Sequence, residues 1–327
     1  MPLLPADQPE ALDTAVAALV AGELVAFPTE TVYGLGARAD DDAAVARIFS
    51  AKGRPADHPL IVHVVDAQAA QAFAAQWPPV AQRLVEAFWP GPLTVIVPRR
   101  PERGAAAAGG QASIGLRCPA HPVARALLQA AAARGVTGVA APSANRFGRV
   151  SPTTAAHVRD EFGDGLMVLD GGACAVGIES TIVDCTRGAP VLLRPGVLTR
   201  AQIEAAAGEA LRDRDASAPR ASGTLDAHYA PRAAVRLFEP QALLEGLAGW
   251  QGATGGTLAV YSRGAMAGPA GVLLRRMPAD PAEAAHELFS VLRELDDQGA
   301  HLIWVEQPPD TPEWEGVRDR LRRAAAA

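Results

Sequence analysis

Short apolar segments alternate with helical patterns along the first two thirds of the chain. Runs of branched and aliphatic side chains between turn residues predict strands at 23–27, 59–65, 93–98, 113–117, 138–143, 166–170, 180–184 and 191–196. Apolar residues at helical spacing predict helices at 10–20, 41–51, 80–88, 122–134 and 153–162. Because two strand segments adjoin within 180–194, we expect an α/β domain whose mixed sheet contains at least one hairpin, not the regular alternation of a doubly wound fold.

The pattern changes at residues 211–233, where Ala, Pro, Ser, Gly and charged residues replace the apolar periodicity. Beyond this segment, strand patterns at 234–238, 257–262, 271–277 and 301–306 alternate with helical patterns at 241–247, 281–295 and 313–322. A chain of 327 residues also exceeds what one hydrophobic core usually holds. The sequence therefore predicts an α/β domain over 1–210, a linker over 211–233 and a smaller α/β domain over 234–327.

Composition and charge exclude several classes of protein. With 49% hydrophobic and 20% charged residues the chain is expected to be globular, and its net charge of -6 leaves nucleic-acid binding dependent on a local patch. No apolar run reaches about 18 residues and no signal-peptide pattern is evident, so we expect a cytoplasmic protein without membrane contact. Cys118, Cys174 and Cys185 form no CxxC pair and are expected to be buried, not bridged or bound to zinc.

The segment "AFPTETVYGLGARA" at 26–39 contains a loose GxGxxA pattern. Dinucleotide-binding turns lead directly from a strand into a helix, whereas the next helical pattern here begins only near residue 41, so such a turn is disfavoured. Two interpretations remain. Thr29, Glu30, Thr31 and Tyr33 form the polar wall of a pocket, or the segment is a turn with solvated polar side chains.

Lys52 is the only lysine among 30 basic residues. Lysine carries a compact, mobile ammonium where arginine carries a rigid planar fork, so the two are not interchangeable at a specific site. Lys52 and Arg54, in a turn stiffened by Pro55, suit neighbouring phosphate oxygens, and His58 and His63 follow closely. The simpler alternatives are a solvated charge at a helix end for Lys52 and an ordinary core or surface residue for His63.

Further polar side chains stand on or after predicted strands. Ser113 and Arg117 are four residues apart and face the same side of one strand, where Arg117 suits a carboxylate unless it is an ordinary surface or ion-paired arginine. Ser143 and Asn145 end another strand, and Ser151 precedes a helix, where it serves either an anion or simply the helix cap.

Two more candidates, Ser180 and Arg194, lie at the ends of the last two strand segments of the first domain. Seven motifs now stand in order: "PTETVYGLG", "KGRP…HPLIVH", "SIGLRCP", "APSAN…SPT", "ESTIVD", "LLRPG" and "HYAP". Together they resemble threonylcarbamoyl-AMP synthase in its long, two-domain form. The resemblance implies a YrdC-like domain, with a twisted mixed sheet and flanking helices around a large electropositive cleft, followed by a Rossmann-like domain.

The resemblance also implies a nucleotidyltransferase reaction. L-Threonine, bicarbonate and ATP give threonylcarbamoyl-AMP and pyrophosphate, with Mg2+ carried by ATP, and the product supplies a downstream transferase complex that modifies adenosine in tRNA. Positioning and charge would drive the reaction, since the carbamate, the carboxylate and the triphosphate are all anionic. The sequence identifies no general base.

Residue by residue, the resemblance implies the following roles. The catalytic group comprises Lys52, Arg54, Ser143 and Asn145. The threonine site comprises Thr31, His63, Arg117 and Ser180. The ATP site comprises Arg54, His58, Ser113, Ser143, Ser151 and Arg194. Tyr229 of "HYAP" would fold back over the occupied cleft. This chain has His58 where the family usually has asparagine, which weakens that ATP contact, and Ser113 where threonine is commoner.

Two alternatives come from other functional classes. A carbamoyltransferase-type enzyme of hydrogenase maturation shares the YrdC-like core, but this chain lacks cysteine zinc fingers and an acylphosphatase-like leader. A non-enzymatic double-stranded RNA-binding protein would use the same cleft for RNA and would show salt-sensitive binding without nucleotide turnover. The acidic net charge argues against more than a weak RNA contact.

Overall fold

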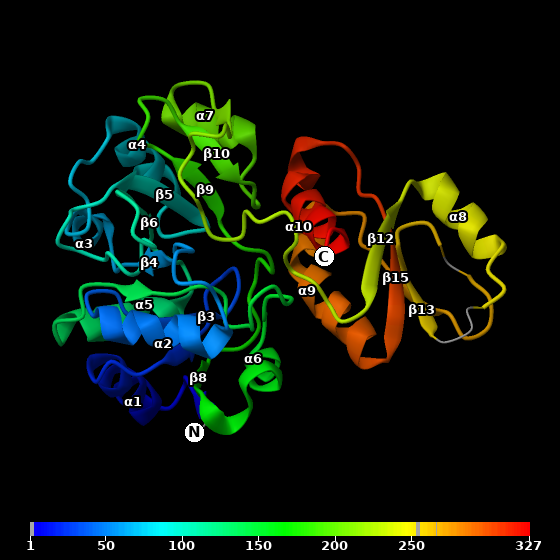
Figure 1. The fold of residues 1–327 in the computed structure, drawn as a ribbon, viewed down its shortest axis with the longest axis horizontal. Helices are drawn as coiled ribbons and strands as arrows, with labels where there is room; N and C mark the ends of the chain where they lie inside the picture. The colour runs from blue at the N-terminus through cyan, green and yellow to red at the C-terminus, as the bar shows by residue number, and fades with distance from the viewer. Residues whose placement is uncertain (1–2, 253–255, 266) are drawn as a thin grey trace. The chain divides into compact units, whose positions relative to one another are not determined.

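The computed structural model describes residues 3–252, 256–265 and 267–327 (Figure 1). The chain divides into two compact units, one formed by residues 1–147 and 151–224 and the other by residues 148–150 and 225–327. The division after residue 224 falls inside the segment 211–233, whose role as a linker stays a prediction.

A mixed sheet forms the centre of the first unit. Its described strands have the order β1-β8-β2-β3-β7-β4-β6-β5-β9-β10-β11. They are β1 (Leu3–Pro5), β2 (Val25–Phe27), β3 (Gly34–Arg38), β4 (Ile61–His63), β5 (Leu93–Pro98), β6 (Ser113–Arg117), β7 (Val139–Ala140), β8 (Met167–Asp170), β9 (Thr181–Asp184), β10 (Val191–Arg194) and β11 (Arg212–Asp213). Parallel pairs such as β4–β6 and β5–β9 stand beside antiparallel pairs such as β5–β6 and β9–β10. The predicted mixed sheet is therefore confirmed, including a hairpin at β9–β10.

Helices cover both faces of this sheet. They are α1 (Pro9–Val20), α2 (Asp42–Lys52), α3 (Ala67–Gln71), α4 (Pro79–Phe88), α5 (Pro122–Ala133), α6 (Ala155–Phe162) and α7 (Arg200–Ala207), with a 3-10 turn, η1 (Gly163–Gly165), after α6. The helices α1 and α5 share one apolar core with β2 and β8, while α2, α4 and α7 contribute to a second core with β3, β5 and β6. Proline stands in the first turn of α1, α4 and α5, where no intrahelical donor is lost.

Several elements of this unit were not predicted from the sequence, among them the strands β1, β3 and β11 and the helices α3 and α7. The glycine-rich residues 34–38 form strand β3, so the dinucleotide-type turn is absent from this segment. A Cβ at Gly36 would lie 2.8 Å from the Phe27 ring, so glycine permits close packing here rather than a phosphate turn. The short helices α3 and α7 were not predicted. Five residues are too few to show a period, and the available signal for α7 was its Thr199 capping box.

The second unit is built on a parallel sheet with the order β12-β15-β13-β14 among its described strands. These are β12 (Ala234–Phe238), β13 (Thr257–Ser262), β14 (Leu273–Arg276) and β15 (Ala300–Glu306). The helices are α8 (Pro240–Ala248), α9 (Pro281–Asp297) and α10 (Glu315–Ala325), with the 3-10 turn η2 (Pro312–Trp314) before α10. Within this unit α8 lies on one side of the strands and α9 and α10 on the other (Figure 1). The Rossmann-like α/β arrangement is confirmed.

Candidate active site

Lys52 is the last residue of α2. Asp41 caps the start of the helix, where its carboxylate accepts hydrogen bonds from the backbone N–H groups of Ala43 and Ala44, and Gly53, with a φ of 64°, caps its end. The side chain of Lys52 is only 3% exposed. The alternative of a solvated charge at a helix end is therefore wrong, although the helix does end here.

Two backbone carbonyl groups hold the Lys52 side chain. Its Nζ donates to the oxygen of Ser143 at 2.7 Å and to that of Asn145. The structure thus brings together Lys52, Ser143 and Asn145, but through the backbone of the loop after β7. The amide side chain of Asn145 itself donates to the carbonyl of Arg146. Burial, followed by the charge of Arg54, lowers the pKa of Lys52 well below its ordinary value.

Arg54 and His58 share an aromatic neighbour that the sequence analysis missed. The guanidinium carbon of Arg54 lies 5.8 Å from the ring centroid of Phe147, and the His58 ring lies 5.5 Å from it at a steep angle. Arg54 also donates to the carbonyl of Pro59 at 3.0 Å. The backbone N–H of Phe147 donates to the carbonyl of Lys52, which ties this ring to the end of α2. The one available signal was an aromatic residue closely following the Ser-x-Asn motif.

Arg117 is the centre of a second polar cluster. Strands β4 and β6 run parallel with His63 opposite Arg117, which places both at the ends of their strands. Arg117 donates to Thr31 Oγ1 at 2.9 Å and to the carbonyl of Gly91 at 3.3 Å, and its Nη2 lies 2.7 Å from Oε1 of Glu30. Arg117 is ion-paired, but in the interior, with 3% of its surface exposed.

The "TET" turn is a buried structure. The hydroxyls of Thr29 and Thr31 are 2.8 Å apart, and Thr29 Oγ1 also accepts from the backbone N–H of Val32. Both threonines and Glu30 are buried. The interpretation as a turn with solvated side chains is therefore wrong. The hydroxyl of Tyr33 bonds outside this turn, since it donates to the carbonyl of Gly172.

His63 packs edge-on against Phe27, with the ring centroids 5.9 Å apart. Burial and then the charge of Arg117 lower the pKa of His63 to about 3. The imidazole is therefore neutral at pH 7 and acts by hydrogen bonding and shape.

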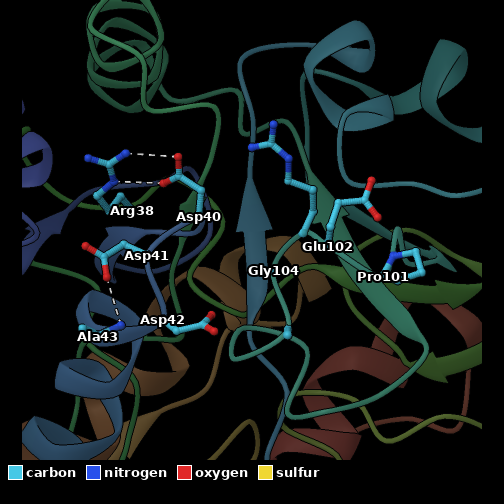
Figure 2. A pocket seen from close by; sticks show the side chains of 10 residues that line it. Arg38, Asp40, Asp41, Asp42, Ala43, Pro101, Glu102 and Gly104 are labelled. Carbon is cyan, nitrogen blue, oxygen red and sulfur yellow. Dashed lines mark hydrogen bonds and ion pairs between the residues drawn. The ribbon is translucent and has the colours of Figure 1, made fainter.

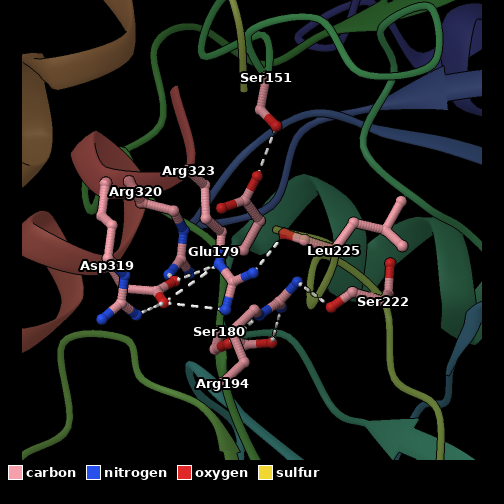
Figure 3. A network of polar contacts seen from close by, with 10 residues as sticks. Ser151, Glu179, Ser180, Arg194, Ser222, Leu225, Asp319, Arg320 and Arg323 are labelled. Atoms are coloured by element: carbon pink, nitrogen blue, oxygen red, sulfur yellow. Dashed lines mark hydrogen bonds and ion pairs between the residues drawn. The ribbon is translucent and has the colours of Figure 1, made fainter. Parts of the chain in front are cut away.

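Ser180 and Arg194 form a third cluster, shown in Figure 3. Arg194 donates to the carbonyl of Ser180 at 3.0 Å, to its hydroxyl at 3.2 Å, and to the carbonyl of Ser222 at 2.9 Å. The hydroxyl of Ser180 lies 2.8 Å from that of Thr94 on β5, a residue that the sequence analysis missed. Ser113 lines a narrow pocket that Thr94 and Ser222 also line.

Ser151 donates its hydroxyl to the buried carboxylate of Glu179 (Figure 3). The side-chain cap of α6 is Thr154, which accepts from the backbone N–H of His157. The interpretation of Ser151 as an ordinary helix cap is therefore wrong.

Tyr229 lies in the second unit, with a positive φ of 64°. Its ring stacks on Phe289 at 5.4 Å, and the guanidinium carbon of Arg320 lies 5.3 Å from its centroid. Arg320 pairs with Asp319 at 2.9 Å, and Arg323 bonds both Asp319 and the carbonyl of Leu225 (Figure 3). The closure of Tyr229 over a cleft stays a prediction.

A wide pocket elsewhere in the first unit contains none of the predicted site residues. Figure 2 shows it between the residues around Asp40 and the loop around Glu102. Three of its charged side chains already have structural partners, since Arg38 bonds both carboxylate oxygens of Asp40 and Asp41 caps α2. We do not assign this pocket to the site.

Within the described residues, no three His, Cys, Asp or Glu side chains converge to hold a metal ion. The described helices also include none that is long and apolar enough to cross a membrane. Cys118, Cys174 and Cys185 are buried free thiols, as predicted.

Comparison with known proteins covers nearly the whole chain. A family model described as "Telomere recombination" matches residues 17–196, and one described as "Threonylcarbamoyl-AMP synthase, C-terminal domain" matches residues 198–326. The threonylcarbamoyl-AMP synthase of Pyrococcus abyssi is 38% identical over 315 residues, which cover 93% of this chain and 91% of the relative. That of Bacillus subtilis is 37% identical over 322 residues, which cover 95% and 92%. The crystal structure of P. abyssi Sua5 complexed with L-threonine matches with a TM-score of 0.87 and 36% identity, covering 96% of this chain and 94% of that one. This chain therefore belongs to the threonylcarbamoyl-AMP synthase family.

Proposed function

We propose that this protein forms threonylcarbamoyl-AMP and pyrophosphate from L-threonine, bicarbonate and ATP, for the threonylcarbamoyl modification of adenosine in tRNA. The full-length relationship to threonylcarbamoyl-AMP synthases supports this activity. The observation that carries the substrate assignment is the buried Arg117, held at the end of β6 by Thr31 and Glu30.

Arg117 is suited to the carboxylate of threonine because a guanidinium fork binds a carboxylate through two parallel hydrogen bonds. Its present bonds to Thr31 and Glu30 restrict its orientation before the substrate arrives. We assign the rest of the threonine site to Thr31, His63 and Ser180. The neutral ring of His63 adds no second positive charge beside Arg117.

The ATP site draws on the group around Lys52 and Arg54 and on the third cluster. We assign it to Arg54, His58, Ser113, Ser143, Ser151 and Arg194, with Mg2+ entering as part of the ATP substrate. Lys52, Arg54, Ser143 and Asn145 surround the reacting groups in this proposal. The positive charges of Lys52 and Arg54 offset the repulsion between the carbamate and the triphosphate when the carbamate oxygen attacks the α-phosphorus and pyrophosphate leaves.

The remaining assignments concern the division of the chain into domains, the role of Tyr229 and the fate of the product. We propose that residues 1–210 form the catalytic domain, that 211–233 form a linker to a C-terminal domain over 234–327, and that Tyr229 closes over the bound substrates. The product would pass to a downstream tRNA-modifying transferase complex in the cytoplasm, with at most a weak direct contact to RNA.

Pyrophosphate release tests the proposal. The purified protein is assayed with ATP and Mg2+, with L-threonine and bicarbonate omitted in turn, beside the variants Arg117→Lys and Arg125→Lys. We expect release to need both substrates, and Arg117→Lys to raise the KM for threonine at least about tenfold without a comparable change for ATP, because lysine cannot make the paired contact.

Arg125→Lys is the matched control, because Arg125 bonds the carbonyl of Val65 and the thiol of Cys118 outside the assigned site. It should retain the parental KM values. Pyrophosphate release that is indifferent to threonine would overturn the proposed substrate.

A further inference from the structure

The proposed reaction releases one proton that needs an acceptor. When the ammonium form of threonine reacts with bicarbonate, a C–N bond forms, a C–O bond breaks and water leaves. The charges and atoms balance only if one further proton leaves the nitrogen. The later attack of the carbamate on ATP releases pyrophosphate and takes up no proton. A base near the reacting groups would therefore assist the first step.

The titratable groups of the threonine cluster are poor bases. Glu30 is engaged at both oxygens, since Oε1 lies 2.7 Å from Arg117 and Oε2 accepts from the backbone N–H of Ala120. His63 has a pKa of about 3, so its neutral ring accepts protons only weakly at pH 7. Among the other buried carboxylates, Glu179 already accepts the hydroxyl of Ser151.

Lys52 has a different geometry. A neutral amine has two N–H donors and one lone pair, and Nζ has two acceptors, the carbonyl oxygens of Ser143 and Asn145. Both acceptors are uncharged. In the described part of the chain no carboxylate forms an ion pair with this side chain, which is 3% exposed. Two donors directed to two carbonyls leave the third direction at the nitrogen for a lone pair, and an arginine at this position would be unable to provide one.

We propose that Lys52 is the general base of carbamate formation: its uncharged Nζ takes the proton released by the amine of threonine, and the resulting ammonium then offsets the charge of the carbamate and the triphosphate. This inference rests on the proposed function. One side chain thus acts first as a base and then as a cation, and the proton leaves to solvent when the products dissociate. This sequence of roles requires lysine. It accounts for the presence of Lys52 in a chain whose other lysine and arginine positions are all arginine.

The charges around Lys52 agree with this role. Burial has the largest effect and, together with the neighbouring Arg54, favours the neutral amine. Glu161 on α6 and Glu179 before β9 act in the opposite direction and favour the ammonium. The balance lowers the pKa, and removal of one of these carboxylates would lower it further.

The single lysine makes the test direct. Protein labelled with 15N-lysine gives one side-chain Nζ signal, whose pH titration by NMR reports Lys52 alone. We expect a pKa well below the ordinary value of about 10.4. The rate of pyrophosphate release in a single turnover should rise with pH through that same pKa and then level off. An ordinary pKa would overturn the proposal of a base, even if pyrophosphate release still required threonine and bicarbonate, so the two proposals fail separately.

Variants separate Lys52 from the amine of threonine, which also titrates. Glu161→Gln removes a carboxylate that favours the ammonium, so it should move both the NMR titration and the rate profile to lower pH. Asp164→Asn, in the turn that follows α6, is the matched control because its carboxylate pairs with Arg159 and should move neither. A rate profile that stays in place while the NMR titration moves would contradict the role of Lys52 as the base.

Replacement of the amine completes the test. Lys52→Arg should lose at least about 100-fold in single-turnover rate, within the usual contribution of a general base. Lys52→Cys treated with bromoethylamine restores an amine of lower pKa, and the rate should recover with its profile shifted to lower pH. The three native thiols are buried, and treated wild-type protein controls for their modification. Recovery without that shift would indicate a purely electrostatic role.

Discussion

Arg117 and Lys52 are both buried basic side chains in the first unit, but their partners differ. Arg117 faces the carboxylate of Glu30 at 2.7 Å, whereas the hydrogen-bond acceptors of Lys52 among the described residues are the carbonyl oxygens of Ser143 and Asn145. A carboxylate compensates a buried positive charge, while neutral carbonyl groups satisfy hydrogen bonds and leave the charge uncompensated. Burial therefore lowers the pKa of Lys52, which agrees with the proton exchange that we propose for it.

This difference fits the two tasks that we assign to the site. Binding the carboxylate of threonine requires a charge that does not depend on pH, and arginine provides it. Transfer of a proton requires a group whose two forms have similar free energies near the working pH, and burial lowers the pKa of Lys52 in that direction. The surroundings, and not only the residue type, distinguish the roles.

The largest expected effect is on stability. Arg117→Met leaves the carboxylate of Glu30 buried without its partner and should lower the free energy of unfolding by about 3–5 kcal/mol. Lys52→Met removes no ion pair and should cost less. The loss of two hydrogen bonds lowers the free energy of unfolding by about 1–2 kcal/mol, and part of this loss is regained because a polar amine is no longer buried. Urea unfolding of both variants at pH 7 measures the contrast. Equal losses would show that the two cations are held in the same way.

The pH dependence of stability tests the neighbour of Arg117. His63 has a folded pKa of about 3 against an ordinary 6.5, so below pH 6.5 the unfolded chain binds a proton that the folded protein does not. Stability from this group is present above pH 6.5 and is lost as the pH falls toward 3. Between pH 7 and pH 4.5, wild-type protein should lose about 2.5 kcal/mol more than His63→Asn. Parallel pH curves for the two proteins would refute this.

The smallest effect concerns the hydroxyl pair between β5 and the start of β9. Thr94→Val removes the partner of the Ser180 hydroxyl with little change of shape, and should cost about 1 kcal/mol of stability and raise the KM for threonine up to about tenfold. Thr14→Val provides the control, because its exposed hydroxyl bonds only the carbonyl of Glu10 in its own helix, and should cost under about 0.5 kcal/mol. An unchanged KM for Thr94→Val would remove Ser180 from the threonine site.

The sequence determined most of the element types and the family. Branched apolar runs predicted the strands that form the cores, and the ordered motifs indicated the threonylcarbamoyl-AMP synthase family before any fold was known. Local patterns of this kind are readable because burial selects apolar residues at the period of each element. The same reasoning missed β3, because a glycine-rich strand has few side chains to show a period.

Only the tertiary structure decided which polar residues act together. Thr31 and Arg117 are far apart in the chain, and the parallel register of β4 and β6 brings His63 into line with Arg117. Thr94 gave no chemical signal of its own, and Phe147 gave only its place after the Ser-x-Asn motif; both became visible through their contacts with Ser180 and Arg54. Composition singled out the lone lysine, but its surroundings of carbonyl groups come from the loop after β7. Those surroundings decide whether its nitrogen carries a proton, because the cost of burying a charge depends on neighbours that the fold supplies.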